Sequence, residues 1–142
     1  METNLIATAS IHINAPRERV WNALVDPAGI KQYMFGTNVV SDWHEGSPIL
    51  WKGEWQGKPY EDKGVILQLD PRHTLQYSHF SPLSGLPDRP ENYHTVTIRL
   101  EAVGNGTRVV LSQDKNATEE ERSHSSTNWE VMLKGLKAFA EA

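Results

Sequence analysis

Residues 118–142 read TEEERSHSSTNWEVMLKGLKAFAEA, and this C-terminal stretch decides the fold. Three glutamates follow Thr118, and acidic residues favour the first turn of a helix because they face the positive end of the helix dipole. Apolar residues then recur at i, i+3, i+4, i+7 and i+10, at Trp129, Met132, Leu133, Leu136 and Phe139. This spacing predicts one long amphipathic helix whose apolar face must be buried against the rest of the chain.

The preceding sequence alternates in the manner of half-buried strands. Between Leu5 and Ile13 every second residue is apolar, which is the period of a strand with one face in the core. The same alternation recurs in Ile49–Trp55, Leu75–His79, Val96–Leu100 and Thr107–Gln113. Turn residues separate these runs roughly every eight to twelve positions, which predicts an antiparallel meander. Residues 65–69 are apolar at both odd and even positions, so the sequence does not show which face of that strand is buried.

Two short helices are expected between the first strand and the meander. Asn14 is a candidate N-cap for a helix that tolerates Pro16 in its first turn and that Asp26-Pro27 ends. A second short helix is expected to run to Gly36, where glycine allows the chain to reverse direction.

These elements form a single α+β domain over residues 1–142. A curved antiparallel β-sheet of about seven strands needs cover on its apolar face, and the long C-terminal helix is the candidate for that role. Because a strongly twisted sheet around one helix leaves space at the centre, we expect a cavity. Residues 81–92, which include three prolines, are expected to form a surface loop or a cavity lid rather than a domain boundary.

Charge and hydropathy exclude several classes of function. The net charge of −4 comes from acids and bases mixed along the chain, so there is no basic stripe for nucleic acid. No apolar run approaches the roughly 20 residues of a membrane-spanning helix, and residues 1–4 do not resemble a signal peptide. We therefore expect no nucleic acid partner, no membrane association and a cytoplasmic location.

The side chains that usually carry catalysis or metals are sparse. The chain has no cysteine, and its six histidines lack the short spacings that place two metal ligands together. Nothing resembles a nucleophile elbow or a glycine-rich phosphate loop. We expect no metal, no cofactor and no established catalytic signature.

Several motifs resemble a known family. Residues 13–24, INAPRERVWNAL, followed by Asp26-Pro27, resemble the opening of the START-like superfamily, also called the SRPBCC or polyketide cyclase and Bet v 1-like group. Within it, the branch named for the activator of the Hsp90 ATPase is similar in Gly64–Pro71, Leu75–Ser78, Gly106–Val109 and in Trp129 with Leu133 and Leu136. The resemblance spans almost the whole chain and implies a helix-grip fold, in which a curved sheet wraps around a long C-terminal helix.

The sequence departs from this branch at three positions. Members often have Gly before the helix Trp and His four residues before it, whereas here these positions are Asn128 and Ser125, with His124 one place off. A Trp is common where His79 stands, so we expect a more polar pocket than usual. The resemblance implies ligand binding or chaperone-related activity but names no ligand.

Eight residues are candidates for contact with a ligand. His79 shares a strand face with Tyr77, and an imidazole at this place can act as an acid or a base. A structural role, in which a partly buried histidine is simply hydrogen-bonded, is the commoner outcome. The remaining candidates are aromatic walls, helix residues and hydrogen-bonding groups at the cavity mouth: Trp51, Trp55, Trp129, Leu133, Gln113 and Tyr33. Core packing explains the tryptophans about as well as ligand binding does.

Three functional hypotheses follow. The first is a non-enzymatic or cryptically enzymatic cavity protein that binds a small hydrophobic, ring-containing molecule. The second, implied by the resemblance alone, is a chaperone-associated domain that binds another protein. The third is a cyclase, dehydratase or hydrolase with His79 as general base. The chain is expected to act as a monomer or homodimer.

Overall fold

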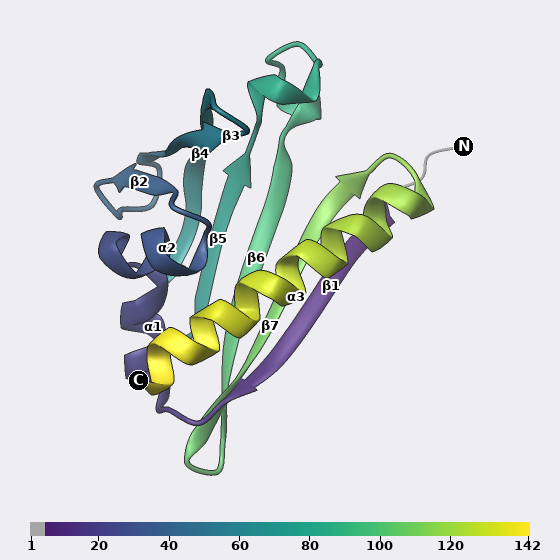
Figure 1. The fold of residues 1–142 in the computed structure, drawn as a ribbon. Coiled ribbons are helices and arrows are strands. Elements are labelled where there is room, and N and C mark those ends of the chain that lie inside the picture. The colour runs from purple at the N-terminus through teal and green to yellow at the C-terminus, as the bar shows by residue number, and fades with distance from the viewer. Residues whose placement is uncertain (1–4) are drawn as a thin grey trace.

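The computed structural model describes residues 5–142, without the side chains of Trp55 and Leu83. It consists of β1 (Leu5–Ile13), α1 (Arg17–Leu24), α2 (Pro27–Tyr33), β2 (Asn38–Ser41), β3 (Pro48–Trp55), β4 (Lys58–Asp70), β5 (Thr74–His79), the 3₁₀ turns η1 (Pro82–Ser84) and η2 (Pro90–Asn92), β6 (His94–Val103), β7 (Gly106–Asn116) and α3 (Glu119–Glu141). The seven strands form one antiparallel sheet in the order β1-β7-β6-β5-β4-β3-β2. The sheet curves around α3, which confirms the predicted α+β helix-grip architecture (Figure 1).

Helix α3 begins and packs as its sequence predicts. The Thr118 side chain accepts a hydrogen bond from the backbone N–H of Glu121, and three acidic residues occupy the first turn. Met132, Leu133 and Leu136 are buried against the sheet, and Trp129 and Phe139 are partly buried beside them. The helix is therefore held by its apolar face.

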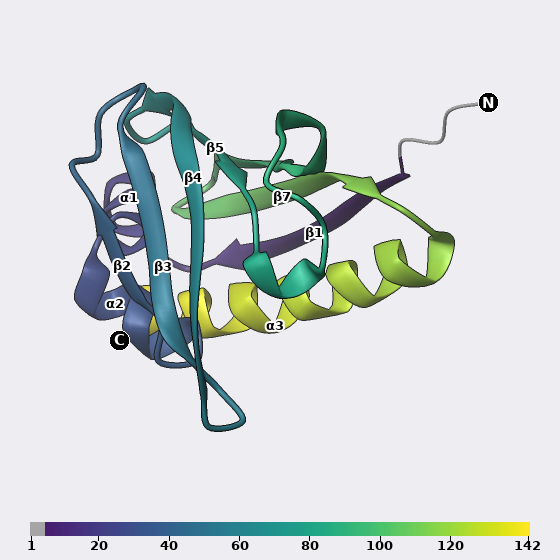
Figure 2. The same cartoon turned by 90° about the horizontal axis from the view of Figure 1, so that it is seen from above.

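Polar side chains of α3 cover the free edge of β1, which lies alongside the helix in both views (Figures 1 and 2). The Ser126 hydroxyl accepts from the backbone N–H of Thr8 at 3.2 Å, and Glu141 accepts from that of Asn14 at 2.8 Å. The Lys137 ammonium donates to the His12 carbonyl at 3.1 Å. The helix thus protects an edge strand that would otherwise offer its backbone to another chain.

The expected N-cap at Asn14 is wrong. The helix starts at Arg17, with Pro16 in extended conformation as the cap residue and no side-chain cap bond. Asn14 lies too early in the chain, and its backbone N–H is bonded to Glu141 instead. The expected second short helix is present but ends at Tyr33, before Gly36: Asp26 caps α2 through the Ala28 N–H at 3.1 Å, and Gly36 lies in the following turn with a φ of +84°.

The structure resolves the facing of β4. Ile66 is fully buried and pairs with Tyr77, whereas Val65 and Leu67 on either side are exposed. A bulge between Ile66 and Gln68 shifts the register by one residue, so that Leu69 pairs with the buried Leu75. A one-residue shift exchanges the two faces of a strand, which explains why this segment is apolar on both parities.

The centre of the domain is almost filled. The space between the sheet and α3 is about 20 Å³, enough for one water molecule. Tyr33, Trp51, Tyr77 and Met132 project into it from three sides. The interior cavity expected from the curvature is therefore small, because large side chains occupy it, and larger pockets lie toward the surface.

Candidate ligand site

A pocket of about 180 Å³ opens between the α2–β2 connection, strands β3–β5 and α3. We call it the rim pocket. Its lining includes five aromatic side chains and one polar pair: Phe35, Trp51, Tyr60, Tyr77, Trp129, Asp62 and His79. The rim pocket therefore combines apolar walls with a small number of polar groups, which is the usual composition of a small-molecule site.

The walls come from strand residues that alternate toward the core. Tyr77 and His79 are two positions apart on β5, and Trp51 lies on β3 with its ring centroid 5.1 Å from that of Tyr77 and 5.0 Å from that of His79. The Trp51 and His79 rings meet edge to face, at 65°. Such offset contacts stabilise the rings in fixed orientations, so this part of the wall is preformed.

His79 is paired with a carboxylate. Its Nε2 lies 2.9 Å from Oδ2 of Asp62, and the two side chains are 29% and 17% exposed, respectively. A carboxylate oxygen accepts hydrogen bonds, so the proton of neutral His79 lies on Nε2 and the lone pair on Nδ1. The second Asp62 oxygen, Oδ1, is buried and has no hydrogen-bond partner among the described residues.

The two buried tyrosines differ in how their hydroxyls are used. The Tyr33 hydroxyl donates to the Ala23 carbonyl at 2.9 Å, and burial, with smaller contributions from Tyr77 and Asp26, raises the pKa of its phenol far above the usual value. Burial likewise raises the pKa of Tyr77, so its phenol stays protonated throughout the physiological range. Within residues 5–142, the Tyr77 hydroxyl makes no hydrogen bond to another described side chain or backbone group.

A second pocket of about 190 Å³ adjoins the rim pocket along α3, and we call it the helix pocket. Met34, Phe35 and Trp129 line both pockets and separate them. The Trp129 indole N–H donates to Oε1 of Gln113, which lines the helix pocket. Phe35 is 72% exposed and has a φ of 56°, an unusual backbone conformation for a residue other than glycine.

The loop of residues 81–92 covers a third pocket, of about 450 Å³, which His79 also lines. Asp88 holds this loop, because its carboxylate accepts from the Tyr93 hydroxyl at 2.6 Å and pairs with the Lys63 ammonium. The Lys63 hydrogen bond, followed by that of Tyr93, keeps the pKa of Asp88 below its usual value. The loop is thus tied to β4 next to the rim pocket.

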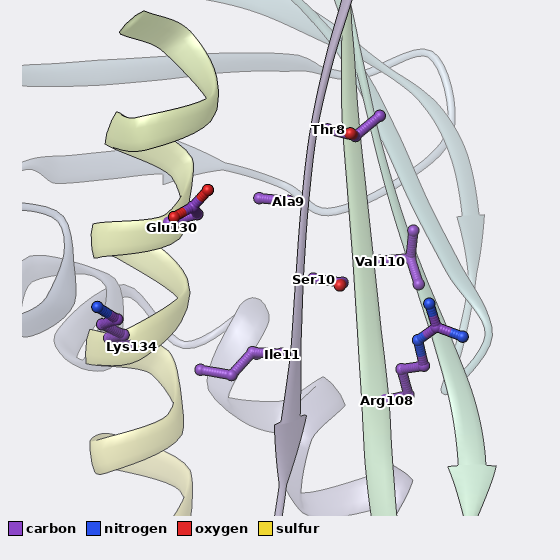
Figure 3. Close-up of a pocket in the computed structure, with 8 residues that line it drawn as sticks. All are labelled: Thr8, Ala9, Ser10, Ile11, Arg108, Val110, Glu130 and Lys134. Atoms are coloured by element: carbon purple, nitrogen blue, oxygen red, sulfur yellow. The ribbon is translucent and has the colours of Figure 1, made fainter. Parts of the chain in front are cut away.

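A groove of about 460 Å³ lies at the edge of β1 (Figure 3). Ala9 and Ile11 point toward α3, which contributes Glu130 and Lys134 from the opposite side. Its lining is aliphatic and charged, without aromatic walls or a buried unpartnered group. We therefore take the smaller rim pocket as the candidate site.

The sequence-predicted residues fall into three groups. The structure brings Trp51, Tyr77, His79 and Trp129 together in the rim pocket and places Gln113 in the adjoining helix pocket. Tyr33 and Leu133 lie in the core, where Leu133 is fully buried. The side chain of Trp55 lies outside the described residues. Their contact with a ligand stays a prediction.

Sequence reasoning missed Asp62, Phe35 and the bonded pair Thr37 and Tyr60, whose hydroxyls are 2.7 Å apart. Asp62 could have been found, because it precedes the buried Ile66 by four positions in one strand and so shares its face. Because the sequence did not show which face of residues 65–69 is buried, Asp62 was not assigned to the inner face. Phe35 follows α2 in a turn, where no periodicity indicates which way a side chain points.

No cluster of three or more potential metal ligands occurs among the residues that the structure describes. In the same part of the chain, no helix has both the length and the apolar character needed to span a membrane.

A family model described as Activator of Hsp90 ATPase homolog 1-like protein matches residues 14–141. This chain belongs to that family. The match covers the INAPRERVWNAL segment from Asn14 onward and continues through α3, so it confirms the resemblance. No curated protein matches this Activator of Hsp90 ATPase homolog 1-like chain.

Solved structures similar to this Activator of Hsp90 ATPase homolog 1-like chain share its fold. ChR145 from Cytophaga hutchinsonii is 64% identical, with a TM-score of 0.87 and coverage of 99% of this chain and 97% of that one. The Aha1 dimer from Colwellia psychrerythraea is 24% identical (TM-score 0.73; 99% and 97% covered), and CalU16 from Micromonospora echinospora is 23% identical (TM-score 0.71; 98% and 87% covered). The last two establish similarity of fold.

Proposed function

We propose that this protein binds a small, largely hydrophobic ring compound in the rim pocket. The observation that carries the proposal is the set of five aromatic side chains around a pocket of about 180 Å³. Flat aromatic walls suit a flat ligand, since offset and edge-to-face contacts add to the free energy of apolar burial. Asp62 and His79 supply the polar groups that orient it.

The volume limits the size of the ligand. An apolar cavity of about 150 Å³ accommodates benzene, so the rim pocket has room for one substituted ring. A larger ligand, such as a sterol, would have to fill the helix pocket as well. That requires Met34 and Phe35 to move, because these side chains separate the two pockets.

The direct test is ligand screening on freshly purified protein. Native mass spectrometry detects a co-purified ring compound, and thermal-shift measurements with single-ring and polycyclic compounds detect stabilisation by binding to the folded state. We expect single-ring compounds to raise the melting temperature and to perturb the NMR signals of Trp51 and Trp129. A clean apo mass, with no shift from any ring compound, would refute the proposal.

Variants of exposed residues connect binding to the rim pocket. We expect Phe35→Ser to weaken binding of a ring compound by roughly tenfold, because it removes one aromatic wall. Val103→Ser is the matched control, since Val103 is also an exposed apolar residue but lies at the end of β6. Equal weakening by both substitutions would mean that the compound binds elsewhere.

Membership of a family named for Hsp90 ATPase activation favours a second candidate, binding to a chaperone. Its test is the ATPase rate of purified Hsp90 with and without this protein. An unchanged rate and no co-sedimentation would remove this candidate.

One similar structure is described as a dimer. We propose that this protein is a monomer or homodimer, which light scattering tests, and that it lies in the cytoplasm, which cell fractionation tests.

A further inference from the structure

His79 and Asp62 form a hydrogen-bonded pair in the rim pocket, an arrangement that is suited to proton transfer. We propose that His79, oriented by Asp62, is a general base that removes a proton from a ring compound bound in the rim pocket. The substrate class is a ring ketone with a carbon-bound proton next to the carbonyl. This inference rests on the proposed function, because the base acts on the bound ring.

The first argument is the hydrogen bond that sets the tautomer. Because Nε2 donates to Asp62 at 2.9 Å, Nδ1 of neutral His79 keeps its lone pair. Nδ1 makes no hydrogen bond to another described residue. A carboxylate that holds the far nitrogen also stabilises the imidazolium formed when the near nitrogen accepts a proton.

The second argument is the environment of the pair. Oδ1 of Asp62 is buried and has no hydrogen-bond partner among the described residues, so water does not reach this side of the carboxylate. Where water is excluded, the attraction between a carboxylate and an imidazolium is stronger than in bulk water. The His79 ring is held against Trp51 at 5.0 Å, so the base is also fixed in orientation.

The third argument is a hydrogen-bond donor in the same pocket. Tyr77 lines the rim pocket as well as the central space, and its hydroxyl stays protonated, because burial raises its pKa, and has no partner among the described residues. A preorganised phenol of this kind can donate to an oxygen that gains negative charge. Base and donor thus lie two residues apart on one face of β5.

The proposed step is balanced without a co-reactant. Nδ1 of His79 takes the proton from the carbon next to the carbonyl, and the electrons of that C–H bond move to the carbonyl oxygen to form an enolate. Tyr77 donates a hydrogen bond to this oxygen. The imidazolium then returns a proton to carbon, and in D₂O it returns a deuteron acquired from solvent.

The experiment measures deuterium incorporation into the single-ring ketone cyclohexanone in D₂O by proton NMR, with binding measured on the same samples by thermal shift and chemical-shift change. We expect the wild-type protein to accelerate exchange over buffer. His79→Gln should lose roughly 100-fold of the exchange rate, the low end of what a positioned general base contributes, while still binding the ketone. His44→Gln, on an exposed turn, is the control and should exchange at the wild-type rate.

Asp62→Asn tests the positioning role. It keeps the shape of the side chain but removes the acceptor charge, so the exchange rate should fall while the binding constant of cyclohexanone stays the same. Tyr77→Phe should likewise slow exchange and leave binding intact. These two variants keep the proposal testable if His79→Gln does not fold, because each targets the rate rather than affinity.

The outcomes separate the two proposals. If cyclohexanone binds but exchange is no faster than with His79→Gln, or if Asp62→Asn and Tyr77→Phe leave the rate unchanged, the general-base inference fails and ligand binding stands. If cyclohexanone does not bind to the wild-type protein, the general-base inference fails for ring ketones, and the proposed function is decided by the screen of the other ring compounds. Binding with His79-dependent exchange supports both.

Discussion

Gly64 controls how closely β4 approaches β5 beside the rim pocket. A Cβ atom placed at this position would lie 1.7 Å from the backbone oxygen of Ser78, far inside the contact distance of two atoms. The obstacle is backbone rather than a side chain, so it cannot rotate away. Glycine therefore permits the pairing that brings Asp62 on β4 next to His79 on β5.

We expect Gly64→Ala to destabilise the protein by more than about 2 kcal/mol, because β4 must move away from Ser78. Urea unfolding measures the free energy. The neighbouring substitution Val65→Thr, at an exposed position of the same strand, should change it by less than about 0.5 kcal/mol. Equal effects of the two substitutions would contradict this account of Gly64.

At the scale of elements, the contact between α3 and the free edge of β1 is made by polar side chains. The Glu141 carboxylate accepts from the Lys137 ammonium and from the backbone N–H of Asn14. These bonds lower the pKa of Glu141 below its ordinary value of 4.5. The hydrogen bond from Lys137 is the largest cause, and that from Asn14 is the next. The end of the helix is therefore linked to the end of β1 in a pH-dependent way.

A lowered pKa in the folded state means that ionised Glu141 stabilises the fold. This contribution is complete above pH 4.5 and is lost as the pH falls through the lowered native pKa. We expect Glu141→Gln to lower the melting temperature slightly at pH 7, and the difference from wild type to disappear in strong acid. Calorimetry at several pH values measures it, and a difference that grows toward acid pH would reverse the predicted sign.

At the scale of the whole molecule, the size of the ligand depends on how the side chains of the sheet and α3 fill the interior. Met132 lines both the central space of about 20 Å³ and the helix pocket. It is buried, so its side chain is part of the barrier between the core and the outer pockets. Packing at this helix position therefore contributes to the separation of the filled interior from the outer pockets, together with Met34, Trp51 and Tyr77.

We expect Met132→Ala to cost about 2–5 kcal/mol of the free energy of unfolding and to open the centre to benzene. Urea unfolding and NMR titration with benzene measure the two effects. Val131→Ala, on the exposed face of α3, is the control and should do neither. A cost below about 1 kcal/mol with no benzene binding would mean that the core closes around the deletion.

Periodic segments were the predictable part of this protein. The alternation of β1, β3, β5, β6 and β7 and the spacing of α3 identified the buried faces, because a face buried along its whole length imposes its period on the sequence. The prediction was incomplete at β4, where the bulge after Ile66 exchanges the faces, and wrong at Asn14, where the cap lies two residues later.

The sequence by itself determined the fold, its strand order along the chain and the inward facing of Trp51, Tyr77, His79 and Trp129. Only the tertiary structure decided that Asp62 pairs with His79, that Phe35 separates two pockets and that the centre is almost filled. Local periodicity specifies which side of an element is buried. The partner that a buried group meets depends on register and side-chain volume across strands far apart in sequence.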